Sequence, residues 1–283
     1  MQKFLIPLDG SKTGESALKW GKFLAQKGKK LELLRCYHPL ASLYSFPDFA
    51  TPPPVSYDLS GFARFARQYL EEVAKENELE ATLTVKEGDP AETIVIYDET
   101  SDSDAILMAT HGQGGLGKWL LGSTATKVVR ASKKPVLLIR PDESDAEPKL
   151  EKILVCLDGS ELAERGLSRA ADLAREFGAS LKLYRAVDET PYPMSDIQTV
   201  LLKAEESARD YLAEKATELE GLKVETTAQL APVVDGVLAQ AKDCDLVVMT
   251  SHGYSGFRRW ILGSIAEAVM QRCDKPLLIV HER

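Results

Sequence analysis

Two segments of this 283-residue chain place histidine, glycine and serine at the same spacing. The first runs from Ile106 to Ser123 and the second from Leu246 to Ser264. In each, an apolar run ends in Thr-His-Gly or Ser-His-Gly, a glycine-bearing segment follows, and Leu-Gly-Ser opens an amphipathic stretch. This order predicts a buried strand, a loop and a helix start. The free N–H groups and the dipole at a helix start favour the binding of a phosphate.

The glycines of these segments suit a binding role. Gly112 and Gly253 lack a Cβ and would let the backbone come close to a ligand. Gly122-Ser123 and Gly263-Ser264 place a serine near the predicted helix cap, a position that serine favours.

Other side chains of the segments allow a structural and a functional interpretation. His111 and His252 would either fix the loop by a hydrogen bond or contact a phosphate or metal. No histidine in the chain has the spacing of a metal site. The loop cations and tryptophans would either meet a phosphate and stack on a base, or point into water and pack the loop; these are Lys118, Trp119, Arg258, Arg259 and Trp260.

An Asp-Gly-Ser tripeptide also occurs twice, each time after an apolar run. The runs 2–8 and 151–157 end at Asp9 and Asp158, an offset of 149. Such a tripeptide is ordinarily a turn. Its repetition after equivalent strands favours a shared functional role for the two carboxylates.

The whole chain repeats the same order of elements. Strand-like runs alternate with helical spacing, which predicts right-handed crossovers and a parallel sheet with helices on both faces. Ligands in such folds bind outside the carboxyl ends of the strands, where the strand order reverses. The further strands are expected at 31–37, 82–85, 105–109 and 135–140, and again at 181–187, 224–230, 246–250 and 276–281.

The length suits two domains. The polar, proline-flanked stretch 141–149 is the predicted linker between domains at 1–141 and 150–283, and 38–57 is a predicted long loop. A formal charge of −8 argues against nucleic acid as the main partner. The chain shows no membrane-length apolar run and no signal-peptide pattern, so we expect a cytoplasmic protein. The four cysteines are expected to be reduced core thiols.

Taken together, these motifs resemble the universal stress protein family in its tandem form. The family motif, G-x2-G-x9-G-(S/T), reads here Ala109-x2-Gly112-x9-Gly122-Ser123 and Thr250-x2-Gly253-x9-Gly263-Ser264. The leading glycine is therefore replaced in both copies. The resemblance implies an adenine-nucleotide hydrolase-like α/β fold, with two domains of strand order 3-2-1-4-5. It also implies pairing of the last strands, 135–140 and 276–281, as an intramolecular pseudo-dimer, and homodimers are a further option.

The same resemblance implies that ATP, AMP or ADP binds as a regulatory ligand, with or without Mg²⁺. Asp9 and Asp158 would contact the nucleoside, the backbone near Cys36 and Ala186 would lie beside the adenine, and the serines would hold phosphate. The implied binding residues are Asp9, Gly10, Ser11, Cys36, Met108, Ala109, Gly112, Gly122, Ser123, Thr124, Asp158, Gly159, Ser160, Ala186, Met249, Thr250, Gly253, Gly263, Ser264 and Ile265.

Several alternatives remain open at the level of sequence. One is a nucleotide-free scaffold that acts through an unknown protein partner, favoured by the bulk of Ala109 and Thr250. Another is a slow ATPase, although no nucleophile and base are paired in the sequence. A phosphorelay receiver would need clustered acids, which are missing beside Asp9. The match of Gly112-x-Gly114-x-x-Gly117 to the dinucleotide fingerprint is weak because it follows the fourth strand.

Overall fold

The computed structural model describes residues 1–37, 60–111, 122–141, 146–188, 197–252 and 262–281. The chain divides into two compact units, Met1–Glu147 and Pro148–Arg283. The predicted loop at 38–57 and part of the predicted linker lie outside the described residues. The expected pairing of the last strands concerns how the two units meet, and it stays a prediction.

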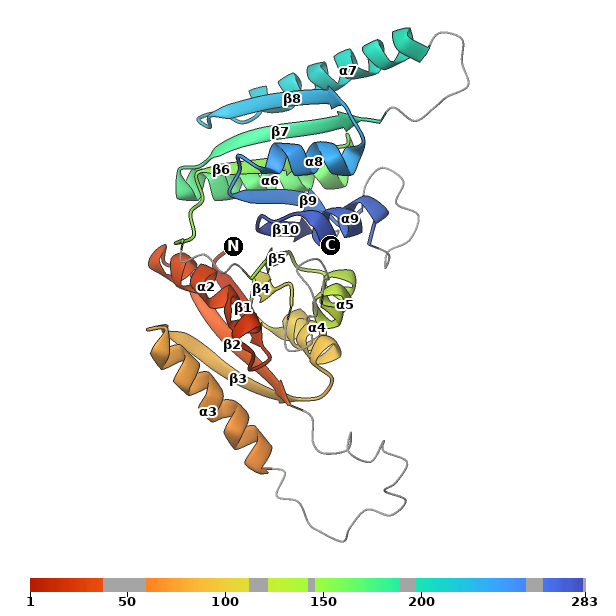
Figure 1. Cartoon of the computed structure of the whole chain (residues 1–283). Helices are drawn as coiled ribbons and strands as arrows, with labels where there is room; N and C mark the ends of the chain where they lie inside the picture. Colours follow the sequence, from red (N-terminus) through yellow and green to blue (C-terminus); the bar gives the residue numbers. More distant parts are fainter. Residues whose placement is uncertain (38–59, 112–121, 142–145, 189–196, 253–261, 282–283) are drawn as a thin grey trace, which may run out of the picture. The chain divides into compact units, whose positions relative to one another are not determined.

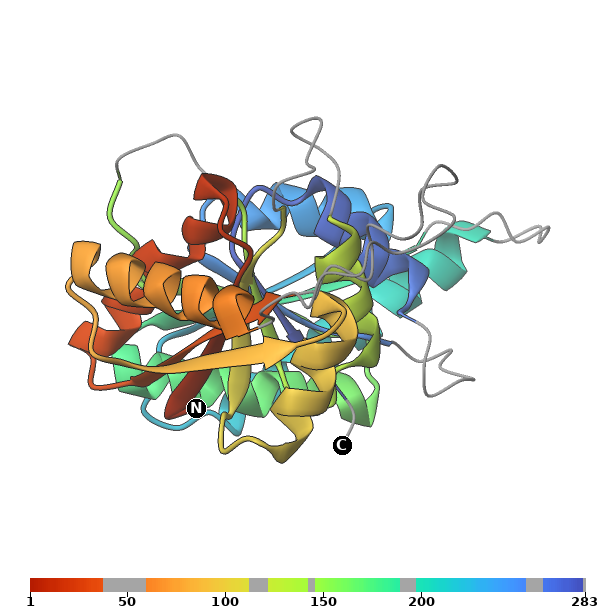
Figure 2. The same ribbon diagram turned by 90° about the horizontal axis from the view of Figure 1, so that it is seen from below.

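The first unit follows the predicted alternation of strands and helices. Its elements are β1 (Lys3–Leu8), α1 (Lys12–Glu15), α2 (Ala17–Gln26), β2 (Lys30–Tyr37), α3 (Ser60–Glu76), β3 (Ala81–Glu87), α4 (Pro90–Thr100), β4 (Ala105–Ala109), α5 (Ser123–Ala131) and β5 (Val136–Ile139). All strands are parallel, in the order β3-β2-β1-β4-β5. Helices α2 and α3 lie on one side of the sheet and α4 and α5 on the other (Figures 1 and 2). The predicted fold and strand order are confirmed.

The second unit repeats this arrangement. Its elements are β6 (Lys152–Cys156), α6 (Glu161–Phe177), β7 (Ser180–Val187), α7 (Ile197–Thr217), β8 (Val224–Leu230), α8 (Val233–Ala241), β9 (Leu246–Thr250), α9 (Ser264–Arg272) and β10 (Leu277–Val280). The strand order β8-β7-β6-β9-β10 is equivalent to that of the first unit. One difference is that the single helix α6 corresponds to two pieces, α1 and α2, in the first unit.

Local sequence signals explain where several helices begin and end. Ser11 and Ser160 cap α1 and α6 by accepting hydrogen bonds from Gly14 N and Ala163 N. Asp89 caps α4, with Pro90 in the first turn. Gly178 ends α6 in the left-handed conformation, at φ 71°. The central strands β4 and β9 are buried along their whole length, as expected for a sheet covered on both faces.

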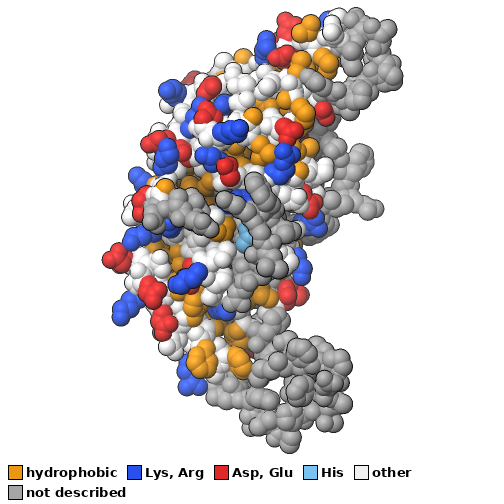
Figure 3. Space-filling view, in the orientation of Figure 1, with side chains coloured by type: hydrophobic (Ala, Val, Ile, Leu, Met, Phe, Trp, Pro, Cys, Tyr) orange, Lys and Arg blue, Asp and Glu red, His pale blue; other side chains and the backbone are white. Residues whose placement is uncertain are grey.

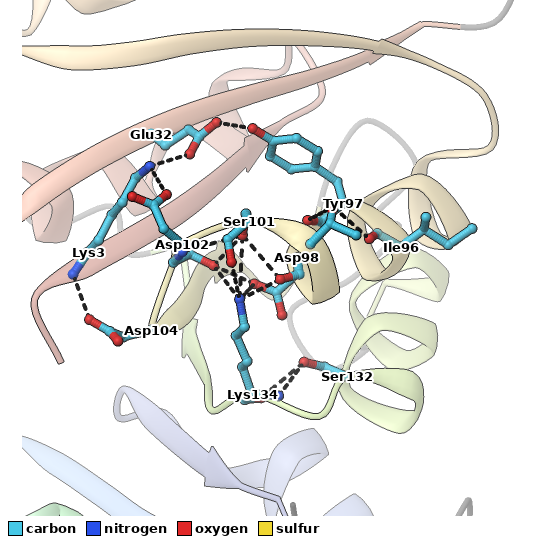
Figure 4. Close-up of polar contacts among 12 residues, drawn as sticks. Lys3, Glu32, Ile96, Tyr97, Asp98, Ser101, Asp102, Asp104, Ser132 and Lys134 are labelled. Atoms are coloured by element: carbon cyan, nitrogen blue, oxygen red, sulfur yellow. Dashed lines mark hydrogen bonds and ion pairs between the residues drawn. The ribbon is translucent and has the colours of Figure 1, made fainter.

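The amino ends of the strands in the first unit are joined by a polar network (Figure 4). Asp104 accepts hydrogen bonds from the backbone of Gln2 and Lys3, which ties the start of β1 to the start of β4. The Lys3 ammonium lies 2.8 Å from Glu32 and also pairs with Asp102. Since Glu32 is only 2% exposed, this pairing offsets the cost of burying its charge.

A second cluster surrounds Lys134, which precedes β5 (Figure 4). Its ammonium contacts the carbonyl oxygen of Asp98, the Ser103 hydroxyl at 3.2 Å and the Asp98 carboxylate at 3.5 Å. Ser103 donates to the same carboxylate at 2.6 Å. Burial nevertheless raises the pKa of Asp98, although these contacts oppose the shift. The cluster ties α4 to the approach of β5.

Ion pairs also join the amino ends of the strands in the second unit, but acidic and basic residues have exchanged places. Lys182 occupies the position equivalent to Glu32 and is also buried. Here the acid, Asp243, is shared by two lysines, at 3.0 Å from Lys152 and 3.2 Å from Lys182. The hydrogen bond from Lys152 is the main cause that lowers the pKa of Asp243 to about 2. The two units therefore share a backbone plan and differ in the sign of the central charge.

We predict that Tyr184→Phe stabilises the second unit. Tyr184 is 1% exposed, and its hydroxyl has no hydrogen-bond partner among the described residues. It points at Gly236, where an added β-carbon would lie 2.0 Å from the hydroxyl oxygen. Removing an unsatisfied buried hydroxyl should raise the unfolding free energy by about 1 kcal/mol, measured by urea denaturation.

The control is Tyr97→Phe, which should lower stability because the Tyr97 hydroxyl donates to Glu32. Gly236→Ala should be strongly destabilising in the wild type and less so with Phe at 184. A loss of stability in Tyr184→Phe would contradict this explanation.

Candidate functional site

The ends of the two central strands lie side by side in each unit. In the first, β1 pairs with β4 in the register Phe4↔Ala105. Continued along the strands, this register puts Leu8 level with Ala109. In the second unit Ile153↔Leu246 puts Leu157 level with Thr250. The strand order reverses at this pair, so the Asp-Gly-Ser turn and the end of the fourth strand flank the crevice where ligands bind in such folds.

The Asp-Gly-Ser turn has the same geometry in both units. The Asp9 Oδ1 atom accepts hydrogen bonds from Ser11 N at 3.0 Å and Ser11 Oγ at 2.6 Å. The Asp158 Oδ1 atom accepts from Ser160 N and Oγ at the same two distances. The glycine between them has φ 80° at Gly10 and 88° at Gly159. The turn interpretation is therefore confirmed, and it fixes where each carboxylate stands.

The helix starts at Gly122 and Gly263 are also alike. Each glycine is the N-cap, with φ −61° in both and ψ 146° or 145°. Gly122 N donates to Thr110 O at 2.7 Å, and Gly263 N donates to Ser251 O at 2.8 Å. A β-carbon at Gly122 would lie 3.0 Å from Thr110 O. The strand end and the helix start are therefore in backbone contact, and a β-carbon would crowd it more at Gly122 than at Gly263, where it would lie 3.3 Å from Ser251 O.

The first turn of each of these helices is open to solvent. Ser123 and Ser264 are exposed, and Ile265 is 39% exposed. The serines occupy the first helical position, and the cap residue before each is a glycine without a side chain. The first N–H groups of an α-helix lack partners within the helix, so this end can bind an anion.

The two histidines directly follow the residues whose carbonyl groups make this contact. His111 Nδ1 is 2.8 Å from Thr110 Oγ1, and His252 Nδ1 is 3.0 Å from Ser251 Oγ. Each histidine is therefore bonded to the residue before it, and its role in fixing the loop stays a prediction, because residues 112–121 and 253–261 lie outside the described residues. Their Nε2 atoms are buried without a partner among the described residues. The site therefore holds an imidazole nitrogen whose hydrogen-bonding capacity is not used by the described part of the protein.

Thr250, which replaces the leading glycine of the motif in the second unit, directs its side chain toward helix α6. Thr250 is 8% exposed, its hydroxyl donates to His252 O at 2.8 Å, and its Cγ2 methyl faces Gly166 on α6. A β-carbon at Gly166 would lie 3.3 Å from that methyl. The equivalent pair in the first unit is Ala17 and Ala109, both buried. A glycine on the helix thus makes room for the threonine on the strand.

The residues expected beside the base lie at the ends of neighbouring strands. Cys36 and Ala186 are near the ends of β2 and β7, and Met108 and Met249 are buried in β4 and β9. Burial raises the pKa of the Cys36 thiol to about 11, so it is not a thiolate at neutral pH. All four cysteines are free. Gly112, Gly253 and the loop tryptophans and cations lie outside the described residues.

Sequence reasoning missed one repeated set of side chains beneath the turn. Arg35 lies against Gly10 and Arg185 against Gly159, and each guanidinium stacks on a tyrosine, Tyr69 or Tyr211. The only signal in the sequence was the shared arginine near the end of the second strand in each half.

Two features are missing from the part of the chain that the structure describes. Its residues include no group of three or more His, Cys, Asp or Glu side chains arranged to hold a metal ion. Among the same residues, no helix is both long and apolar enough to cross a membrane. On the face shown in Figure 3, acidic and basic side chains are interspersed, and no large basic patch is seen there.

Comparison with known proteins gives the family. The model of the universal stress protein family matches residues 1–140 and 149–281. The chain belongs to this family. A universal stress protein of Mycolicibacterium smegmatis is 30% identical over 193 residues, covering 66% of this chain and 65% of the relative. Universal stress protein Rv2005c of Mycobacterium tuberculosis is 24% identical over 98% of this chain and 96% of its own length.

Solved structures of similar proteins show the same fold. A universal stress protein from Archaeoglobus fulgidus aligns with a TM-score of 0.71 at 22% identity, covering 99% of this chain and 98% of that one. Protein PA1789 from Pseudomonas aeruginosa, described as functionally unknown, aligns at 0.67 and 20% identity, covering 99% and 92%. At these identities the likeness concerns the fold.

We predict that His111 is neutral at pH 7. Burial, assisted by the charge of Arg140, lowers its pKa below 6.5. Since the unfolded chain takes up this proton at higher pH than the folded one, the contribution to stability is complete above pH 6.5 and is lost as pH falls toward the folded pKa. NMR titration of the imidazole should give a midpoint below 6.5.

Arg140→Met should move that midpoint upward, though still below 6.5 because burial remains. Lys75→Met, a charge change at the end of α3, is the control and should leave it unchanged. A midpoint at or above 6.5 in the wild type would contradict the prediction.

We predict that Gly166 and Thr250 are energetically coupled. Alanine at 166 favours the helix by up to about 1 kcal/mol, but crowding against the threonine methyl costs about 1–3 kcal/mol. Gly166→Ala should therefore be destabilising in the wild type and stabilising with Thr250→Ala, measured as a double-mutant cycle in urea. Gly61→Ala, where an added β-carbon has nothing within 4 Å, is the control. Equal effects of Gly166→Ala in both backgrounds would refute the coupling.

Proposed function

We propose that this protein binds adenine nucleotides, one in each unit, and uses them as regulatory ligands. The ligand is ATP, or AMP or ADP, with or without Mg²⁺. The observation that carries the proposal is the pair of equivalent helix starts, at Gly122 and Gly263, held in backbone contact with the ends of β4 and β9.

The chemistry of these helix starts supports phosphate as part of the ligand. N–H groups and the positive end of the helix dipole favour negative charge. The exposed Ser123 and Ser264 add a hydroxyl donor at the same place. In our proposal these groups, with the amides of Thr124 and Ile265, hold the phosphates.

The turn beside the helix start supports a nucleoside as the rest of the ligand. Asp9 and Asp158 are held beside the crevice by the serine of their own turn. A carboxylate there can accept a hydrogen bond from a ribose hydroxyl or a base amine. The ends of β2 and β7, at Cys36 and Ala186, would offer backbone to the adenine.

We propose that both units bind a nucleotide, because Thr250, the bulkier replacement of the leading glycine, is accommodated by its neighbours. The Thr250 methyl packs toward Gly166 and its hydroxyl is bound by its own chain, so its bulk is directed at α6. This favours nucleotide binding over a nucleotide-free scaffold. Fast ATP turnover is not part of the proposal, because the sequence pairs no nucleophile with a base.

We predict that the wild type binds two molecules of ATP in isothermal titration calorimetry. Gly122→Val should reduce the stoichiometry to one, Gly263→Val likewise, and the double variant to none, because a side chain there collides with the strand-end carbonyl. At a hundredfold excess over the dissociation constant, ATP should stabilise each binding unit by about 2.7 kcal/mol.

The matched control is Gly61→Ala, which should keep both sites. No heat of binding for ATP, ADP and AMP, with and without Mg²⁺, would refute the proposal and favour the scaffold. Phosphate release at steady state would instead indicate the slow ATPase.

A further inference from the structure

An arginine lies under the glycine of each Asp-Gly-Ser turn. A β-carbon at Gly10 would stand 3.2 Å from Arg35 Nη2, and one at Gly159 would stand 3.3 Å from Arg185 Nη1 and Nη2. Both glycines have positive φ. Arg35 Nη1 also donates to Leu8 O at 3.0 Å, directly before the turn. The guanidinium therefore contacts the turn from below in both units.

Each arginine is in turn held by an aromatic ring on the following helix. The Arg35 guanidinium carbon lies 5.5 Å from the ring centroid of Tyr69 on α3. Arg185 lies 5.0 Å from the ring of Tyr211 on α7. A cation at this distance from the ring is attracted by its π-electrons. The planar guanidinium is suited to such stacking, whereas a lysine ammonium is not planar.

The tyrosine hydroxyl connects this arginine to the helix that follows the turn. We call the arginine, the tyrosine and the glutamate that the tyrosine contacts the arginine circuit. Tyr69 donates to Glu15 Oε1 at 3.0 Å, and Tyr211 donates to Glu164 Oε1 at 3.3 Å. Both glutamates lie on the helix that begins right after the turn, α1 or α6. Burial, with the glutamate beside it, raises the pKa of Tyr211 to about 12 and also raises that of Tyr69. The hydroxyls therefore stay protonated and remain donors at neutral pH.

The position of the carboxylate follows from this circuit. Asp9 and Asp158 are bonded to the serine of their own turn, so the position of each carboxylate depends on the position of the turn. The turn is fixed from below by the arginine and from the following helix by the glutamate. The same four residue types recur in both units, although the spacing from arginine to tyrosine differs between them, so local sequence alone does not produce the arrangement.

We propose that Arg35 and Arg185 are positioning residues for the nucleoside contacts of Asp9 and Asp158, and that Tyr69 and Tyr211 hold each arginine in place. The inference rests on the proposed function, since it names what fixes the nucleoside side of that site. The arginine acts through the turn and touches no phosphate.

The experiment uses the full chain with Gly263→Val, which leaves the first site to be measured alone. Arg35→Met should weaken ATP binding about tenfold or more, the equivalent of one hydrogen bond to a charged group. The factor should be the same for adenosine, because the effect concerns the nucleoside and not the phosphates. Arg35→Lys should restore little, because it cannot reproduce the stack.

The decisive measurement is the double-mutant cycle with Asp9→Ala. If Arg35 acts through Asp9, Arg35→Met should cause no further loss once Asp9 is alanine. Arg185→Met in the same background is the matched control and should leave ATP binding at the first site unchanged. Lys75→Met, which removes an exposed charge at the end of α3, should also be neutral.

The results that would overturn the inference are distinguishable from one another. If Asp9→Ala weakens binding and Arg35→Met does not, the positioning role is wrong while the proposed function stands. Full additivity of the two changes would likewise refute the positioning role alone. If the parent chain binds no adenine nucleotide, both fall. Should Arg35→Met fail to fold, Tyr69→Phe decides: a smaller loss that disappears with Asp9→Ala supports the role, and unchanged binding refutes it.

Discussion

The arrangement of each unit depends on one close backbone contact, between the carbonyl after the fourth strand and the amide of the glycine that starts the next helix. With 2.7 Å from Gly122 N to Thr110 O, and 2.8 Å from Gly263 N to Ser251 O, the strand end and the helix start cannot separate without losing a buried hydrogen bond. Because the helix axis starts there, its dipole is directed at the crevice where the strand order reverses. The small residue at the helix start and the electrostatics of the site both follow from this contact.

The two units share this contact but differ at several pairs of neighbouring residues, and within each pair one difference offsets the other. Thr250 on the strand faces Gly166 on the helix, where the first unit has two alanines. At the amino ends, a lysine between acids in the first unit becomes an acid between lysines in the second. In each case a change in volume or sign is matched by its neighbour, because a packed interior and a buried charge each leave little freedom. The backbone geometry of the site is unchanged.

The sequence predicted the strands and the helix starts at Ser123 and Ser264, since these depend on periodicity, caps and glycine, which are local. The binding role of the residues there stays a prediction. The sequence could not predict which face of the sheet the Thr250 side chain occupies, because a strand buried on both faces has no alternation of polar and apolar residues. The sequence also could not predict the contacts among the arginine, tyrosine and glutamate residues. Arg35 and Tyr69 are separated by a whole connection and half a helix, and only the packing of α3 on β2 brings them together. The loops with Gly112 and Gly253 stay a prediction.

Different kinds of interaction are found at the amino and carboxyl ends of the strands in each sheet. At the amino edge, Asp104 and Asp245 bind backbone N–H groups of the first strand, and ion pairs join neighbouring elements. At the carboxyl edge, Asp9 and Asp158 each accept hydrogen bonds from the serine of their own turn, and each histidine Nδ1 contacts the hydroxyl of the preceding residue. The ion pairs and backbone contacts that join the strands at the amino edge therefore involve other side chains than the ones proposed to bind the ligand. The threonine at 250 can then be accommodated against Gly166 on α6 while the sheet stays intact.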